Sequence, residues 1–148
     1  MKTSGKFGRK VFDLRLLVVL LAIASARSWA QSPQPQPRVV EVLADHDSRY
    51  KMEGQKQPVI TVKAGELITL RITARKAKNI NRNGDVHGFT LLRAKDRSPV
   101  AEWDFLLKPG AQEFTLAAPS EPGEYVVVCT VICSQDHEGM NMKFVVLP

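Results

Sequence analysis

The chain has 148 residues, of which 44% are hydrophobic and 24% charged, and its formal net charge at pH 7 is +6. Residues 1–30 contain six of the 21 basic residues and one of the 15 acidic residues, so the remainder is close to neutral. That remainder has no basic cluster interleaved with aromatic side chains, which excludes nucleic acid as the expected partner.

The first 30 residues have the order of segments found in an export signal. Five basic residues lie among the first 15, an apolar run follows from residue 16, and small residues such as Ala26 and Ala30 come next. This order predicts a signal peptide cleaved after Ala26 or Ala30. The apolar run is shorter than the roughly 20 residues that cross a membrane, so a short N-terminal anchor is the less favoured alternative. We expect an exported protein, periplasmic or on the outer face of the cytoplasmic membrane, with no membrane span in the mature chain.

A short linker and one folded domain follow the signal. Residues 31–38 (QSPQPQPR) predict an extended Pro/Gln-rich linker, and the domain is expected over residues 39–148. Apolar residues of the domain recur with period two, as at Ile68, Leu70 and Ile72, and turn signals separate these runs. The predicted strands are residues 39–43, 58–63, 66–75, 87–92, 100–107, 113–118, 124–128 and 142–146. The pattern indicates an all-β, antiparallel Greek-key sandwich of about eight strands without a helix.

The segment with the most chemistry lies between the last two predicted strands. Residues 125–142 (YVVVCTVICSQDHEGMNM) contain Cys129, Cys133, His137 and Met140 with the spacing C-x3-C-x3-H-x2-M. A loop can bring residues three or four positions apart to one point, which a strand cannot do. Two thiolates, an imidazole and a thioether are soft donors that favour copper over hard cations. His87, at the start of a distant predicted strand, is the candidate that would complete the site.

These residues also have simpler interpretations. In an oxidising compartment two cysteines form a disulfide by default, but a disulfide explains neither His137 nor Met140, and we expect it only in oxidised, metal-free protein. His87 is otherwise a buried core histidine. Met140 is otherwise a core residue, and Met142 would share a strand face with it; the spacing from His137 favours Met140. His46, among acidic residues in a predicted loop, is expected to be exposed.

The motif resembles the binuclear copper (CuA) domain of cytochrome c oxidase subunit II and of nitrous oxide reductase. The resemblance rests on the cysteine-to-methionine segment, on residues 122–125 (PGEY) before it and on residues 85–87 (DVH) upstream. It implies a cupredoxin-like β-sandwich whose electron-transfer centre contains two copper ions. It further implies that Cys129 and Cys133 bridge both ions as thiolates, that His87 binds one ion and that His137 binds the other.

The resemblance also implies two weaker ligands. Met140 would be an axial ligand, and Val131 would offer its backbone carbonyl to one copper. Oxidase subunits commonly carry Glu at the position of Val131; since the family uses the carbonyl there, the change should not abolish binding. A second departure is that no two-helix membrane hairpin precedes the domain. We therefore expect a protein other than a complete oxidase subunit II of the usual kind.

The expected function is electron transfer with a redox protein such as a cytochrome c or a membrane oxidase. The domain is not expected to be catalytic alone, although it would suit the electron-entry component of a cytochrome c oxidase. Two other interpretations stay open. One is a mononuclear cupredoxin that leaves Cys129 spare and uses Cys133, His137, Met140 and His87. The other is a copper-delivery or assembly protein.

Overall fold

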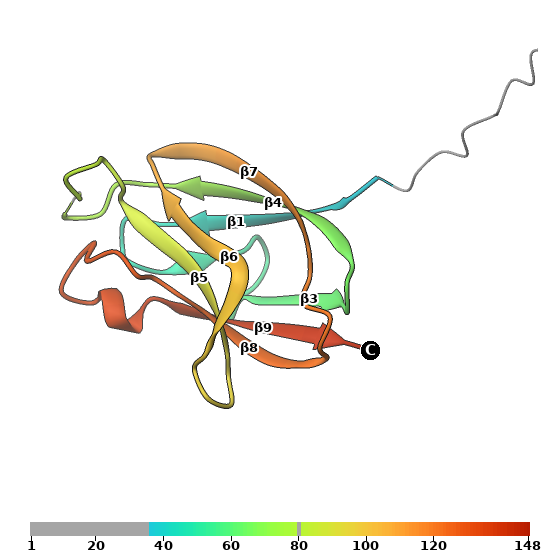
Figure 1. Cartoon of the computed structure of the whole chain (residues 1–148). Helices are drawn as coiled ribbons and strands as arrows, with labels where there is room; N and C mark the ends of the chain where they lie inside the picture. The colour runs from blue at the N-terminus through green and yellow to red at the C-terminus, as the bar shows by residue number, and fades with distance from the viewer. Residues whose placement is uncertain (1–35, 80) are drawn as a thin grey trace, which may run out of the picture. The chain divides into compact units, whose positions relative to one another are not determined.

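The computed structural model of the chain describes residues 36–79 and 81–148, which form two β-sheets (Figure 1). The four-stranded sheet has the order β2-β1-β4-β7, with β1 (Arg38–Ala44), β2 (Tyr50–Lys51), β4 (Leu67–Ala74) and β7 (Gly110–Ala117). The five-stranded sheet has the order β3-β9-β8-β5-β6, with β3 (Val59–Lys63), β5 (His87–Arg93), β6 (Pro99–Leu107), β8 (Gly123–Val128) and β9 (Asn141–Leu147). The described residues also contain one short 3-10 helix, η1 (His137–Gly139).

The predicted all-β sandwich is confirmed, and the described part of the chain contains nine strands in place of about eight. Each predicted run forms a strand, and the additional strand, β2, has only two residues, too few to show a period-two pattern. The expectation of purely antiparallel pairing is wrong, because β1 pairs with β4 and β3 pairs with β9 in parallel. Side chains alternate between faces in both kinds of pairing, so the sequence pattern does not distinguish them.

The two sheets bury a common hydrophobic core. Along β4, Ile68, Leu70 and Ile72 are completely buried, whereas Leu67 is 50% exposed. On the outer face of the same strand, Arg71 forms ion pairs with Glu41 on β1 and with a glutamate on β7. Burying an Ile or Leu side chain contributes about 1.5–3 kcal/mol to the stability of the fold. The burial of these alternating apolar side chains therefore holds the two sheets together.

Strand β5 positions one end of the domain for function. It lies between β8 and β6, and its first five residues are buried. Its register with β8 pairs Thr90 with Val128, so His87 extends beyond the end of β8, where Cys129 begins the β8–β9 connection. Figure 1 shows the β4–β5 and β8–β9 connections at the same end of the domain. His87 and the cysteine segment therefore meet although they are distant in the sequence.

The predicted boundaries are only partly covered by the structure. Strand β1 begins at Arg38, which pairs with Ile68, so the last residue of the predicted linker already belongs to the sheet. The predicted signal peptide and residues 31–35 of the linker lie outside the described residues. Within the described part of the chain, no helix combines the length and the apolar character that a membrane crossing requires.

Candidate metal centre

The cysteine segment is the connection that follows β8, as the sequence predicts. Cys129 comes directly after the strand, and its backbone N–H donates to the Met140 carbonyl at 3.1 Å, which closes the base of the loop. Farther along, the Cys133 N–H donates to the Val131 carbonyl at 2.7 Å. This bond spans two residues, which is the pattern of a γ-turn, and it turns the chain sharply at Ile132. The turn leaves Ile132 70% exposed and buries the residues on either side of it.

Three predicted ligands converge at this loop. The donor atoms of His87, Cys129 and Cys133 all lie within 4.8 Å of one another, and all three residues are buried. The two sulfurs are 3.8 Å apart and both cysteines are free thiols. A disulfide bond length is about 2.05 Å, so the pair is not joined in this structure.

The imidazole of His87 is oriented as a metal ligand would be. Its Nε2 lies 2.9 Å from the backbone carbonyl of Arg75. A carbonyl only accepts, so Nε2 carries the proton and Nδ1 keeps its lone pair. Nδ1 is buried and has no hydrogen-bond partner among the described residues. Burial lowers the pKa of His87, against the opposing effect of the Arg75 carbonyl, which favours the neutral ring that binds metals.

Each sulfur has a polar neighbour. The Gly88 N–H donates to Cys129 Sγ at 3.3 Å, and the Ser48 hydroxyl lies 3.6 Å from Cys133 Sγ. Tyr50 donates its hydroxyl to the carbonyl of Gly88 and so fixes the same residue from the other side. Burial, together with the nearby sulfur of Cys133, raises the pKa of Cys129 to about 11, although two backbone contacts act in the opposite direction. In the metal-free domain Cys129 is therefore a protonated thiol at neutral pH, and a bound cation would displace its proton.

The remaining predicted ligands have different surroundings. Val131 is buried, and its carbonyl lies 3.3 Å from Cys129 Sγ, beside the sulfur cluster. His137 is not a member of the three-residue cluster; its Nδ1 donates to the carbonyl of Ser134 at 3.0 Å, which leaves Nε2 free to accept. Met140 and Met142 are both buried, so burial does not choose between them. Met142, however, pairs with a residue of β8 inside the sheet, whereas Met140 precedes β9.

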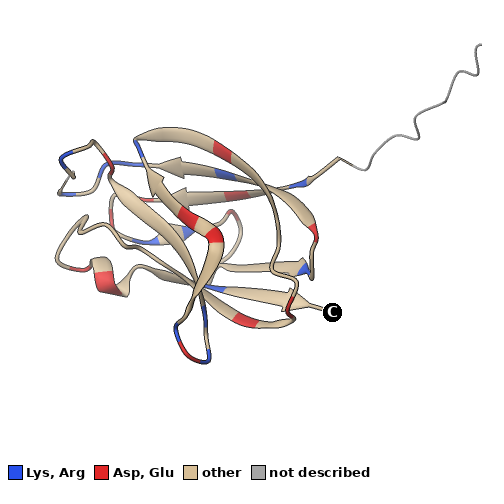
Figure 2. Cartoon of the chain, in the orientation of Figure 1, with Lys and Arg blue, Asp and Glu red and all other residues tan. Residues whose placement is uncertain are grey.

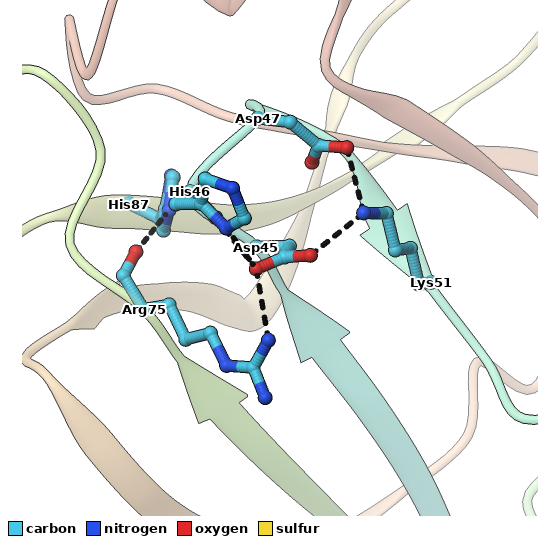
Figure 3. Close-up of polar contacts among 6 residues, drawn as sticks. All are labelled: Asp45, His46, Asp47, Lys51, Arg75 and His87. Atoms are coloured by element: carbon cyan, nitrogen blue, oxygen red, sulfur yellow. Dashed lines mark hydrogen bonds and ion pairs between the residues drawn. The ribbon is translucent and has the colours of Figure 1, made fainter.

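A charged network lies beside His87 (Figure 3). Asp45 accepts hydrogen bonds from Lys51 at 2.6 Å and from the ring of His46 at 2.7 Å, and Arg75 Nη1 lies 3.4 Å away. Arg75 thus holds the His87 ring through its carbonyl and reaches Asp45 through its guanidinium. The His46 side chain is 67% exposed, as expected from the sequence. The network fixes the β1–β2 and β4–β5 connections around the imidazole.

Positive charge gathers on the β4–β5 connection (Figure 2). Lys76, Lys78 and Arg82 are all exposed there. The same connection is attached to the β8–β9 connection that carries the two cysteines, called here the ligand loop, because the Asn79 N–H donates to the carbonyl of Cys133 at 2.9 Å. Any partner that approaches the ligand loop from this side meets a basic surface.

Sequence reasoning missed the residues that support the ligands. Gly88 directly follows His87, and a glycine inside a strand marks a close approach of another chain segment, so it could have been recognised. Ser48 reaches the site from the β1–β2 connection, and Tyr50 reaches it from the start of β2. No local sequence pattern marks either residue.

Comparisons with known proteins identify the fold. No protein-family model matches the sequence, and no curated protein matches it. Among solved structures, auracyanin A, a "blue" copper protein from the green thermophilic photosynthetic bacterium Chloroflexus aurantiacus, has a TM-score of 0.52 at 21% identity and covers 76% of this chain and 100% of its own. Auracyanin B has a TM-score of 0.51 at 20% identity, with 78% and 93% covered. A chain of a heme-copper terminal oxidase dimer has a TM-score of 0.50 at 16% identity, with 90% of each chain covered. The fold is therefore cupredoxin-like.

Proposed function

We propose that the domain is a copper-binding electron carrier with a binuclear, CuA-type centre. The observation that carries this proposal is the convergence of two free thiols and a ring nitrogen of His87 within 4.8 Å. The Nδ1 of the same ring is buried and has no hydrogen-bond partner among the described residues. Two thiolates and an imidazole are soft donors suited to copper, and the cupredoxin-like fold favours copper over zinc. His137, Met140 and the carbonyl of Val131 are the proposed additional ligands.

The surroundings of Cys129 favour two ions over one. A mononuclear centre would use Cys133 and leave Cys129 spare. Yet Cys129 is buried in the cluster, its sulfur receives the Gly88 N–H, and it lies 3.8 Å from the sulfur of Cys133. A spare thiol needs no such donor, whereas a thiolate ligand does, because the hydrogen bond stabilises its negative charge.

The protein's contribution to electron transfer is a rigid ligand frame. The bound copper would supply the one-electron redox couple. His87 is held in one tautomer by the Arg75 carbonyl, and Cys129 is held by Gly88, so neither side chain has to move when the charge of the centre changes. The three donors that converge at the site, His87, Cys129 and Cys133, are all proposed copper ligands, which favours a carrier over an enzyme.

The proposed partner is a redox protein, either a cytochrome c or a membrane oxidase, outside the cytoplasm. The export signal predicted over residues 1–30 supports this location. Of these two alternatives, the membrane oxidase is supported by the structural similarity to a chain of a heme-copper terminal oxidase dimer.

Copper content and the spectrum of the loaded protein test the proposal. The purified full chain should take up two coppers, and the unpaired electron of its one-electron-oxidised form should show hyperfine coupling to two copper nuclei. One copper with a four-line pattern would favour the mononuclear interpretation. Failure to bind copper while zinc binds would overturn the proposal.

A second measurement separates a carrier from a copper-delivery protein. The loaded chain is mixed with a cytochrome c and, separately, with a metal-free copper acceptor. A carrier exchanges electrons with the cytochrome and retains its copper. Efficient transfer of copper without electron exchange would contradict the carrier function.

A further inference from the structure

The β1–β2 connection places the hydroxyl of Ser48 beside the sulfur of Cys133. Ser48 is 2% exposed, and its N–H donates to the Asp45 carbonyl at 3.0 Å, which closes the turn. Its hydroxyl lies 3.6 Å from Cys133 Sγ and 2.7 Å from Ser134 Oγ. The turn thus brings a polar group to a ligand sulfur from a segment 85 positions away.

These contacts form a chain of hydrogen bonds that ends on sulfur. Ser134 Oγ accepts the backbone N–H of Asp136 at 3.1 Å, and a hydroxyl can donate one bond while it accepts others. A metal-bound Cys133 has no proton, so only Ser48 can be the donor between them. Ser48 must then accept from Ser134. With the thiolate present the direction is therefore fixed, from the Asp136 N–H through both hydroxyls to the sulfur of Cys133.

The two sulfurs differ in the source of their donors. Cys129 receives a backbone N–H from Gly88, and this donor cannot be deleted without changing how closely β5 approaches the cysteine. The donor to Cys133 is a side chain, so its effect can be tested by itself.

We propose that Ser48 is a positioning residue that donates an O–H···S hydrogen bond to Cys133 and thereby raises the reduction potential of the centre. This inference rests on the proposed copper function. The hydrogen bond withdraws electron density from the sulfur. Reduction adds one electron to the centre, so a donor at the sulfur stabilises the reduced form more than the oxidised form. The same withdrawal lowers the energy of the sulfur electrons that produce the thiolate-to-copper absorption.

Two substitutions remove the hydroxyl in different ways. Ser48 has a φ of 57°, a conformation that alanine disfavours and glycine accepts. Ser48→Ala and Ser48→Gly therefore differ in backbone strain but share the loss of the donor. Both variants should keep the copper content of the unsubstituted chain, show a lower reduction potential by voltammetry and shift the thiolate-to-copper band to longer wavelength.

Two further variants serve as comparisons. Ser134→Ala removes the group that donates to Ser48 but leaves Ser48 in place, and it should produce a smaller shift in the same direction. Ser98→Ala removes a hydroxyl that bonds to Asp96 in the β5–β6 turn, and it should change neither the potential nor the band. If Ser48→Ala or Ser48→Gly fails to fold, Ser134→Ala still tests the chain of bonds.

The outcomes distinguish this inference from the proposed function. If the unsubstituted chain binds no copper, the proposed function is wrong and the inference is wrong with it. If that chain binds copper normally but both Ser48 variants keep its potential and band position, only the inference is wrong. Loss of thermal stability in the Ser48 variants without a change of potential would assign Ser48 a purely structural role and would also overturn the inference.

Discussion

The backbone N–H of Gly88 reaches the sulfur of Cys129 at 3.3 Å because Gly88 has no side chain. A Cβ at this position would lie 2.4 Å from Thr130 Oγ1 and 2.7 Å from the backbone nitrogen of Thr130. Both distances are below the 3.0 Å that real Cβ atoms respect, and the second involves backbone. The close approach of β5 to the ligand loop therefore depends on this glycine.

Gly88→Ala should destabilise the domain and weaken copper binding. The added methyl group forces the ligand loop away from β5, which we expect to cost about 1–3 kcal/mol of unfolding free energy. Urea denaturation and copper titration measure the two effects. Gly139→Ala is the matched control, because a Cβ there meets only Arg49 Nη1 at an ordinary 3.7 Å. Equal stability and copper content in the two variants would contradict the prediction.

Cys129→Ser should reduce the copper content to one ion per chain at most. A serine hydroxyl is a poor substitute for a bridging thiolate because it stays protonated at neutral pH. Cys133→Ser should lose copper altogether, since both the binuclear and the mononuclear interpretations use Cys133. Metal analysis of the purified variants measures both. Two coppers in the Cys129→Ser variant would show that Cys129 is not a ligand.

Met140→Leu and Met142→Leu should have different consequences. A thioether bond to copper is long and weak, so Met140→Leu should retain both coppers and change the reduction potential. Met142 packs within β9, and its replacement by the similarly sized Leu should cost less than about 1.5 kcal/mol of stability and leave the potential unchanged. Voltammetry and thermal denaturation of both variants decide the matter. A shift of potential confined to Met142→Leu would make the assignment of Met140 wrong.

Glu66→Gln should lower stability in a way that depends on pH. The Arg38 guanidinium and the Lys63 N–H bind this carboxylate at 2.7 Å each and hold its pKa below the ordinary value of 4.5. Its stabilisation is therefore complete above that value and is lost as the pH falls through the lowered pKa of the folded state. We expect a difference of about 1 kcal/mol between the two chains at pH 7, shrinking at acid pH.

Urea denaturation of the metal-free chains across this pH range measures the effect of Glu66→Gln. Glu53→Gln, at an exposed carboxylate, is the control and should stay close to the unsubstituted chain at every pH. A constant difference between Glu66→Gln and the unsubstituted chain from pH 7 to acid pH would contradict the electrostatic explanation.

Much of the fold could be predicted from the sequence because strand burial is a local property. In β4, the alternation of Ile68, Leu70 and Ile72 with polar residues marks the strand and its inner face. The partner of each strand is not a local property. The parallel pairing of β1 with β4 depends on contacts between residues such as Val40 and Leu70, about 30 positions apart, and no pattern within either strand indicates it.

Part of the candidate site could also be predicted from the sequence, because some of its residues lie close together in the chain. Cys129 and Cys133 are close in sequence and chemically distinctive, and the structure brings them together with His87 as expected. The ligand roles of these three residues, and those of His137, Met140 and Val131, stay predictions. Ser48 could not be found from the sequence, because a lone serine has no distinctive spacing and its contact with Cys133 exists only in the folded chain.

Three backbone groups hold the candidate donor residues in place, and this affects the free-energy cost of binding an ion. Gly88 holds Cys129, the Arg75 carbonyl holds the His87 ring, and Asn79 holds the carbonyl of Cys133. None of these bonds needs a metal, so the conformational entropy of arranging the donors is lost when the sheets fold. Binding an ion then costs little further ordering. If the proposed copper centre forms, the same stiffness would limit how far the donors move between oxidation states and would keep the reorganisation energy of electron transfer small.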